Sequence, residues 1–449
     1  MLRIKKFTKE LTYFLAVFIF LGLTACNKDN NPVDSSGGGT SKVSGSVNDS
    51  DGLSKTLGKG QAVESNTSGI QGATVIIAEV QANGSLNTVS TQSVQTDVDG
   101  KFTVETKLSG VKNLVVAAAK GTSEWKAVVS SEVKSGTTVY AQPLNVETTA
   151  EAEVYTRLKA SGKINTVSQL DVQFYVNSEV AAQIRGNASM QDQFINALEV
   201  RQQAHTQASS NAYFGITSAQ LQTIANTKAQ AQVSFEEALY IAGDSQSNAE
   251  NKFSIYQTTI ISAYANANVK AESYAKLSEI TSRVFINATA SMSSQTYVAC
   301  AKSNYLRIAF VIRQAMEAKF QETGASSSQV SAVASAGVTL SSSIKSSVTI
   351  DQIITAFAQY NSAVVAQLKL TFSFQATIID TIEANIQGAG GAKAILNASV
   401  GASASTDMII AAYLSFSNSV KTLVQTSLTG VSSTQVNAAT EIFILANMN

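Results

Sequence analysis

The residue types that usually do chemistry are sparse in this chain and poorly spaced. His205 is the single histidine among 449 residues, so a histidine-based metal cluster is excluded. A Ser-His-Asp arrangement would need His205 as its base, but no G-x-S-x-G elbow occurs to present a nucleophile. Because the surrounding VRQQAHTQASS carries no partner signature, we expect His205 to be a solvated helix residue.

The S-x-x-K pattern of penicillin-binding enzymes occurs at Ser342 and Lys345 and again at Ser131 and Lys134. In those enzymes the pattern comes first and a K-[ST]-G triplet comes last. Here the triplet at residues 134–136 precedes Ser342 and overlaps the pattern at Ser131. The order is wrong for that mechanism, and a Ser-rich chain produces such matches by chance.

Four further stretches fail as binding or catalytic sites. The Gly-rich residues 388–393 lack the spacing of a phosphate-binding loop and predict an interhelical loop. Residues 49–52 and 97–100 have the Asp and Gly of tight turns but no calcium-loop Glu. The adjacent Glu236 and Glu237 would point about 100° apart on a helix, so they form no facing acid/base pair. We therefore predict no cofactor, no metal ion and no enzymatic activity.

The two cysteines have different surroundings. Cys300 lies in the helical pattern TYVACAKSNYLRIAFVI, where a small apolar residue suits a packed face. A reactive cysteine needs an accessible, electropositive setting, so we expect Cys300 to be a buried, inert thiol. Cys26 instead follows an apolar run and precedes polar, Gly-rich sequence.

Residues 1–25 are typical of a secretory signal, with a basic MLRIKK segment, an apolar run and small residues before Cys26. Leu23-Thr24-Ala25-Cys26 resembles the lipobox of bacterial lipoproteins. The resemblance implies cleavage between Ala25 and Cys26 and attachment of lipid to Cys26, and two or more acyl chains hold a protein on a bilayer. Asn27 follows the cysteine in place of Asp, and resemblance to enterobacterial lipoprotein sorting then implies the outer membrane, with the periplasmic and surface faces both open.

The residues after the lipidated cysteine predict a tether and then a β-rich domain. Residues 26–42 combine Asn, Asp, Ser and a Gly run, a mixture that cannot bury a core. Residues 43–147 contain short alternating runs separated by turn signals, which predicts a sandwich of about seven strands. One of these runs is STQSVQT, residues 90–96.

The order of motifs in residues 43–147 resembles the carboxypeptidase regulatory-like, or transthyretin-like, β-sandwich. The residues that carry the resemblance are Gly45, Gly72, Ala73, Asp97, Gly100 and Phe102. In that family the module usually accompanies another domain and is not itself catalytic. The fold class we predict is therefore multidomain, with a seven-stranded Ig- or transthyretin-like β-sandwich followed by an all-α bundle of long helices.

Residues 148–449 have no proline, and their apolar residues follow helical three- and four-residue steps. The steps slip around LKLTFSF, residues 368–374, where we expect a bend or a break. Capping boxes are predicted where Ser or Thr precedes Gln by three residues, at Thr166, Thr217, Ser326, Thr349 and Ser432. Similar spacing after Gly215, Gly324 and Gly430 leaves open an internal duplication, about 215–323 and 324–429.

Charge restricts the partners that the chain can bind. The first 25 residues hold four of the 32 basic residues and one of the 32 acidic ones, so the rest has no basic excess and nucleic acid is not expected. From Gly324 onward only nine charged residues remain. These charge-poor helices predict a neutral polar surface or, as the sharper alternative, an interface for a protein or glycan partner.

The leading functional hypothesis is a non-catalytic, lipid-anchored protein of the cell envelope whose β-sandwich presents a helical binding or structural domain. One alternative is an accessory protein that binds glycans or polymers through aromatic residues such as Trp125, although Trp125 is more often a core residue at such a position. Another alternative is a hydrolase with a site made only of carboxylates distant in sequence.

Overall fold

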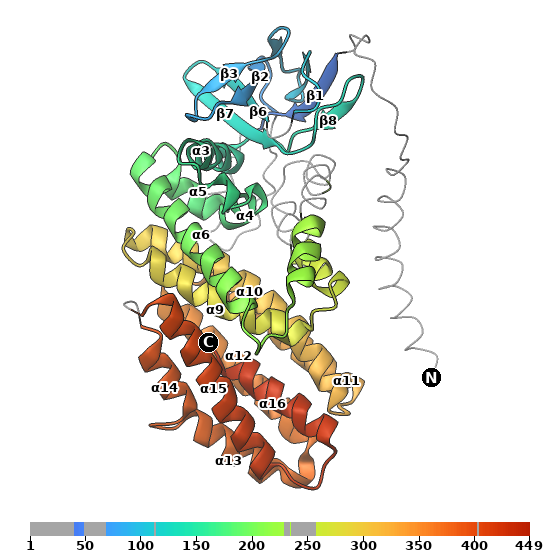
Figure 1. The fold of residues 1–449 in the computed structure, drawn as a ribbon, viewed down its shortest axis with the longest axis vertical. Coiled ribbons are helices and arrows are strands. Elements are labelled where there is room, and N and C mark those ends of the chain that lie inside the picture. Colours follow the sequence, from blue (N-terminus) through green and yellow to red (C-terminus); the bar gives the residue numbers. More distant parts are fainter. Residues whose placement is uncertain (1–39, 49–68, 112–113, 229–233, 235–256, 402–403) are drawn as a thin grey trace. The chain divides into compact units, whose positions relative to one another are not determined.

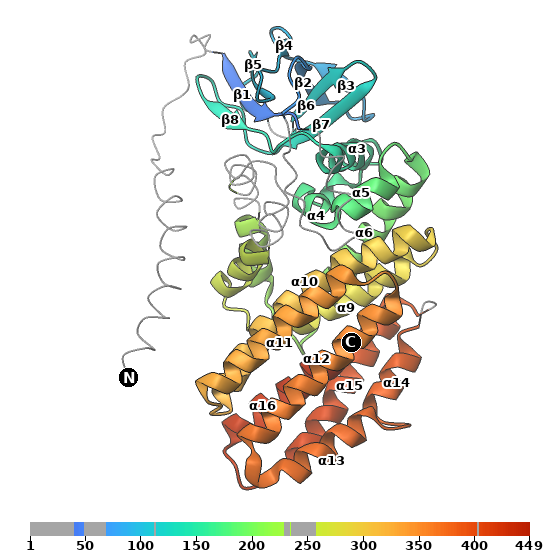
Figure 2. The ribbon, with the colours of Figure 1, turned by 180° about the vertical axis from the view of Figure 1, so that it is seen from behind.

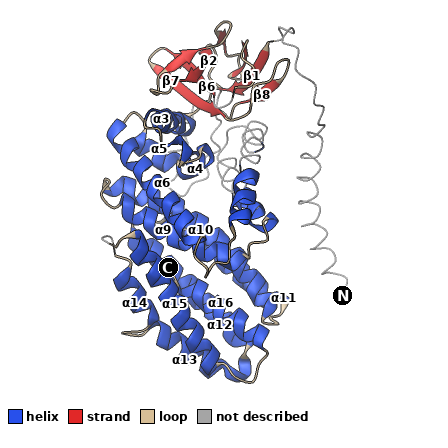
Figure 3. Ribbon diagram, in the orientation of Figure 1, coloured by secondary structure: helices blue, strands red, loops and turns tan. Residues whose placement is uncertain are grey.

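Strands fill the first part of the described chain and helices fill the rest, as the sequence predicted (Figure 1, Figure 3). The computed structural model describes residues 40–48, 69–111, 114–228, 234, 257–401 and 404–449. Residues Thr40–Asn449 form one compact unit. The predicted signal and most of the predicted tether therefore lie outside the described residues.

The β region contains eight strands within the described residues, against about seven expected. They are β1 (Ser41–Ser46), β2 (Thr74–Val80), β3 (Leu86–Thr88), β4 (Val94–Gln95), β5 (Lys101–Thr106), β6 (Leu114–Lys120), β7 (Ser123–Val129) and β8 (Thr138–Tyr140). One sheet has the order β5-β1-β8, and the other has the order β3-β2-β6-β7 with β4 also paired to β2. β1 and β8 are parallel, whereas β1 pairs antiparallel with β5.

The expectation of a single strand at residues 90–96 was wrong. β3 ends before it, and β4 covers only two of its residues, since Thr91 and Gln92 form a bend. A run rich in Ser, Thr and Gln offers little apolar surface for a sheet face, so its pairing with β2 is short.

The two sheets share one apolar core. Val43 and Val104 from the smaller sheet join Ile77, Val116 and Trp125 from the larger one in a single buried cluster. Alternation along β5 determines which of its side chains face this core. Phe102 and Val104 are buried, whereas their immediate neighbours are more exposed. Trp125 is 8% exposed, which confirms the expectation that it is a core residue.

The turn interpretation of residues 97–100 is confirmed. The Asp97 carboxylate accepts hydrogen bonds from the backbone N–H of Asp99 at 2.9 Å and of Lys101 at 2.8 Å. Gly100 has φ 73°, and a Cβ there would lie 2.4 Å from the carbonyl oxygen of Val47. Only glycine fits this turn, where the chain passes close to its own backbone.

The first helix, α3 (Val146–Ala160), covers the second face of the larger sheet. Asn145 caps it, accepting a hydrogen bond from the N–H of Thr148 at 2.9 Å. Ala152 and Tyr155 of α3 pack against three valines of the sheet, Val80, Val115 and Val128. Because Val115 alternates with Leu114 and Val116, the sheet is buried on both faces.

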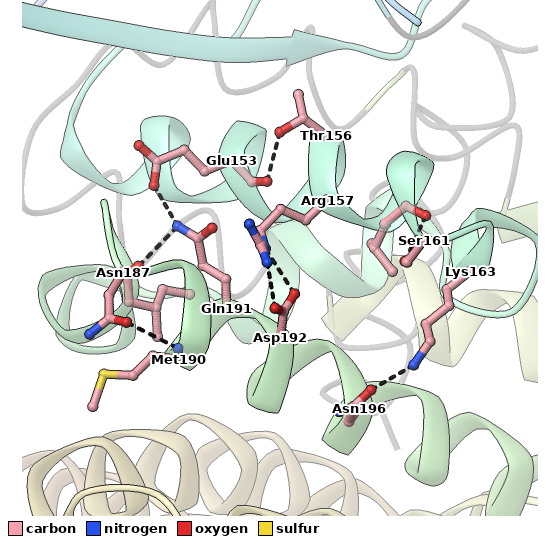
Figure 4. A network of polar contacts seen from close by, with 12 residues as sticks. Glu153, Thr156, Arg157, Ser161, Lys163, Asn187, Met190, Gln191, Asp192 and Asn196 are labelled. Atoms are coloured by element: carbon pink, nitrogen blue, oxygen red, sulfur yellow. Dashed lines mark hydrogen bonds and ion pairs between the residues drawn. The ribbon is translucent and has the colours of Figure 1, made fainter. Parts of the chain in front are cut away.

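Polar contacts then connect α3 to α6 (Ala188–Ser209), as Figure 4 shows. The Glu153 carboxylate accepts hydrogen bonds from the Gln191 amide at 2.6 Å and from the N–H of Gly186 at 2.7 Å. Arg157 forms a two-point ion pair with Asp192, in which its Nε lies 2.8 Å from Oδ1. The helical region is thus fixed to the β region through α3.

Helices make up the rest of the described chain. After α3 come η1 (Lys163–Asn165), α4 (Gln169–Tyr175), α5 (Ser178–Ile184), α6, helices at 218–228 and 257–266, α9 (Ala271–Thr289), α10 (Ser294–Glu322), α11 (Ser327–Ser346), α12 (Ile350–Thr371), η2 (Ser373–Gln375), α13 (Ala376–Gln387), α14 (Ala392–Ser399), α15 (Thr406–Ser427) and α16 (Ser433–Asn447). α12 and α16 lie side by side in both views, although they are far apart in sequence (Figure 2).

Most of the predicted helix starts are confirmed. Ser326 and Ser432 form complete capping boxes with the Gln three residues later, and Thr217 does the same with Gln220. Thr349 caps α12, but the Gln352 side chain accepts from Val348. The box predicted at Thr166 was wrong, because η1 carries the chain past it and Ser168 is the cap of α4.

The expected break at residues 368–374 is confirmed. α12 ends at Thr371, Phe372 is buried with φ −106° and ψ 50°, and the next helical segment is turned by 106°. No single helix among the described residues has the length and apolar character of a membrane span. α12 and residues 373–399 have that length and apolar character only when taken together, and they form this bent pair.

Candidate functional site

The residues for which the sequence predicted lipid attachment, Ala25 and Cys26, lie outside the described residues. Glu236 and Glu237 also lie outside them, as do residues 49–52. Lipidation at Cys26 stays a prediction on which the structure does not bear.

The other motif matches bring no chemical groups together. Ser342 and Lys345 are exposed on α11, and residues 388–391 form the predicted loop between α13 and α14. Cys300 is fully buried, as expected, and burial raises the pKa of its thiol to about 12. Among the described residues, no group of three or more His, Cys, Asp and Glu could hold a metal ion.

His205 is not the solvated residue that we expected, because it is only 8% exposed. It lies on α6, where Phe194, Leu198, Arg201, His205 and Ala208 are all buried. These residues follow steps of four and three, which is the spacing of one helix face. The missed signal was that Arg201 and His205 occupy core positions of this stripe.

The face of α6 opens onto a buried group of polar and aromatic side chains that we call the cation cluster. Its members are Asp171 and Tyr175 of α4, Arg201 and His205 of α6, Lys228 of the 218–228 helix, Tyr264 of the 257–266 helix, Tyr274 of α9 and Arg307 of α10. Two helices each contribute a pair four residues apart, and residues at that spacing lie on the same helix face. Six helices therefore meet at this cluster.

Tyr175 is the centre of the cluster. The guanidinium carbon of Arg201 lies 4.8 Å from the centre of its ring, and that of Arg307 lies 5.5 Å away. Arg307 also donates hydrogen bonds to two tyrosine hydroxyls, that of Tyr175 and, at 3.3 Å, that of Tyr274. Cation–π contacts of this kind are strongest where water is excluded.

Tyr264 and Tyr274 form a second set of aromatic rings in the cluster. Tyr264 stacks on Tyr274 with ring centres 3.9 Å apart, and its hydroxyl is hydrogen-bonded to Nε2 of His205. The Lys228 ammonium, on a half-buried side chain, lies 5.8 Å from the centre of the Tyr264 ring. The aromatic rings thus separate the positive groups without neutralising them.

Burial and the neighbouring charges shift the pKa values of the cluster's members. Burial lowers the pKa of His205 to about 3, helped by the charges of Lys228 and Arg201, so its imidazole is neutral at pH 7. Burial alone would raise the pKa of Asp171, but Lys228 and Arg201 bring it below its ordinary value. Asp171 is therefore ionised, and it accepts a hydrogen bond from Ser168 at 2.6 Å.

The charges of the cluster do not balance. Among the described residues, three basic side chains, Arg201, Lys228 and Arg307, face the single carboxylate of Asp171, and burial lowers the pKa of Lys228 and brings that of Arg307 to about 10. Both arginines are 3% exposed, and neither Nε has a hydrogen-bond partner in the described part of the chain. An ion taken out of water without compensation destabilises a fold by several kcal/mol, so this arrangement calls for an explanation.

A second buried ionisable site lies on α9. Glu279 is fully buried, and its Oε1 accepts a hydrogen bond from the Tyr413 hydroxyl at 3.2 Å. Burial raises the pKa of Glu279 to about 7, although the charge of Arg283, one turn further along α9, opposes the rise. Such a carboxyl exchanges a proton near neutral pH, which is the range useful to a general acid or base.

Two carboxylates, those of Glu272 and Glu322, pair with the same lysine, Lys319. Lys319 of α10 lies 3.0 Å from Glu272 and 2.9 Å from Glu322. Its positive charge stands between the two acids and neutralises them, so this site joins α9 to the end of α10. It does not provide the facing acid and base that a carboxylate-only hydrolase needs.

Comparison with known protein families, with curated proteins and with solved structures gives no match for this chain.

Proposed function

We propose that this chain is a non-catalytic, lipid-anchored protein of the cell envelope, in which a carboxypeptidase regulatory-like β-sandwich carries a helical binding domain. The observation that carries the proposal is the run Leu23-Thr24-Ala25-Cys26, directly after an apolar segment and directly before polar, Gly-rich residues. In this proposal Cys26 is the lipid attachment site and the outer membrane is the destination.

The arrangement after the tether supports a presenting role for the β region. Its two sheets share a core, its turn at Asp97 to Gly100 is tight, and its larger sheet is covered by α3. The Arg157–Asp192 and Glu153–Gln191 contacts then connect α3 to α6. A β module fixed to a helical region in this way would act as a spacer that transmits the position of the anchor.

The anchor is tested by replacing Cys26 with Ser in the cell that makes the protein. We expect the wild type to take up labelled fatty acid and to remain with the membranes after high-salt washing, whereas Cys26→Ser takes up none and is released. Cys300→Ser is the matched control, and it should behave as the wild type in both assays. Membrane retention of Cys26→Ser would contradict the anchor.

A protein partner at the charge-poor helices is favoured by a specific observation. Large apolar side chains are exposed on this part of the chain, namely Val338, Val348, Ile354, Leu370, Phe374, Ile395 and Met408. Leu370 and Phe374 are 62% and 69% exposed at the corner between α12 and η2. Crosslinking in intact cells should capture one partner, and Phe374→Ser should reduce that capture while Val98→Ser, at an exposed turn of the β region, should not.

The glycan-binding alternative has less support. Trp125 is a core residue, and the tyrosines that line the helical core, such as Tyr155, Tyr175 and Tyr413, are each at most 1% exposed. A glycan platform needs an exposed aromatic face, so the aromatic residues named for this role do not favour it.

A further inference from the structure

The surplus positive charge of the cation cluster needs a counter-charge that the described residues do not supply. Arg201 and Arg307 both lie against the Tyr175 ring, and Lys228 lies against Tyr264. Asp171 neutralises one of the three, and Ser168 is the residue that hydrogen-bonds to its carboxylate. His205 adds a neutral ring. At least one buried arginine charge is therefore left without a counter-charge among the described residues.

Each of the two arginines also has an N–H donor that makes no hydrogen bond to the described residues. The hydrogen bonds of Arg307 go to the neutral hydroxyls of Tyr175 and Tyr274, and its Nε has no partner among the described residues. The Nε of Arg201 also has no hydrogen-bond partner among the described residues. A guanidinium presents its N–H groups in a flat fork that matches the oxygens of a carboxylate or a phosphate. The unused Nε donors are thus chemically suited to an oxyanion.

An uncommitted amide lies on a helix of the same cluster. Gln257 is fully buried, and neither atom of its amide has a hydrogen-bond partner in the described part of the chain. It precedes Tyr264 by seven residues, which is two helical turns, so both side chains occupy one face about 10 Å apart along the axis. Buried amides are normally satisfied, and Gln257 is a further donor for a bound group.

We propose that the cation cluster is a binding site for a small oxyanion, a phosphate- or carboxylate-bearing molecule held by Arg201, Arg307 and Lys228. The anion would supply the missing negative charge, accept from the free guanidinium donors and lie among the tyrosine rings. The proposal rests on the binding role of the helical domain, but it is independent of the lipid anchor, which has its own test at Cys26.

The experiment is a calorimetric titration of the full-length protein in detergent. Inorganic phosphate and succinate are the two probes, with ionic strength held constant by chloride. We expect the wild type to bind at least one of them, and binding of only one assigns the ligand to the phosphate or to the carboxylate class. Arg201→Gln and Arg307→Gln should each weaken binding by about tenfold or more, because each removes a charge-assisted contact.

Two further variants keep the test informative. Lys228→Gln changes a half-buried side chain and should fold even where an arginine variant does not, and it should also weaken binding. Arg157→Gln is the matched control, since this arginine pairs with Asp192 outside the cluster and should bind as the wild type does. The proposal is overturned if the wild type binds neither probe, or if Arg157→Gln weakens binding as much as the cluster variants do.

Discussion

Two groups of polar side chains in the helical region differ in burial and in how their charges are satisfied. In the amide network Glu383 is half-buried, whereas Arg201 and Arg307 of the cation cluster are buried. In the amide network of the last helices, the Glu383 carboxylate of α13 accepts hydrogen bonds from Asn361 at 2.7 Å, Asn447 at 3.1 Å and Gln387 at 3.2 Å. Neutral donors from α12, α13 and α16 thus satisfy one charge. In the cation cluster, three basic side chains accompany the one carboxylate of Asp171 among the described residues, and each lies over an aromatic ring.

The difference separates a structural network from a binding site. The amide network ties three helices together, and each oxygen of its one carboxylate accepts from a neutral amide, although the buried Oδ1 of Asn361 has no partner among the described residues. The cation cluster draws on six helices, yet it leaves like charges together and arginine donors unused. Buried ion groups of this kind are weak evidence for stability, and their retention needs another reason. The reason that we infer is the binding of an anion.

The largest predicted effect is the acid sensitivity of the cation cluster. The folded pKa of His205 is about 3, against an ordinary value of 6.5, so the unfolded chain takes up the proton first. Stability is therefore complete above pH 6.5 and is lost as the pH falls toward 3, by about 4 kcal/mol at pH 3.5. Urea unfolding at pH 7 and pH 3.5 should show this loss, and His205→Gln should lack this contribution. An equal loss in His205→Gln would contradict the prediction.

The next predicted effect concerns Glu279, whose contribution to stability should change with pH in the opposite direction to that of His205. Its folded pKa of about 7 exceeds the ordinary value of 4.5, so the native state holds the proton between these values. Stability falls as the pH rises through that window, by about 3 kcal/mol at pH 8. Glu279→Gln keeps a carbonyl for Tyr413 and should be more stable than the wild type at pH 8, as measured by urea unfolding. Equal slopes between pH 5 and pH 8 in both proteins would refute this.

A smaller loss should follow from breaking the amide network. Asn447→Ala removes the donor 3.1 Å from Glu383 and leaves that carboxylate short of a partner. We expect about 2 kcal/mol of destabilisation by chemical denaturation. Asn385→Ala, at an exposed position of α13, is the control and should stay within about 0.5 kcal/mol of the wild type. If both variants lose the same free energy, the network is not what stabilises these helices.

Much of the fold could be predicted from the sequence, because local chemistry determines it. Alternation predicted most strands, the Asp and Gly of residues 97–100 predicted their turn, and Ser with Gln three residues later predicted the starts of α11 and α16. The split of residues 90–96 was missed because strand length depends on what the neighbouring strand offers. The proposed duplication lies partly outside the described residues and stays a prediction.

The cation cluster could be predicted only in part. The spacing of Phe194, Leu198, Arg201 and His205 placed two polar residues on an apolar helix face, which is a local signal. That Arg201 meets Tyr175 and Arg307 depends on how α4, α6 and α10 pack, and no local pattern encodes this. The charge surplus appears only once those helices are together.

The measurement that tests the central claim most directly is the stability of Arg201→Met with and without anion. Methionine keeps much of the volume and removes one unpaired charge, and such replacements of buried ions are often neutral or stabilising. In chloride buffer we predict that Arg201→Met is at least as stable as the wild type. In phosphate or succinate, whichever binds, the wild type should gain stability and the variant should not. Equal destabilisation of Arg201→Met in both buffers would contradict the account and would make Arg201 a structural residue.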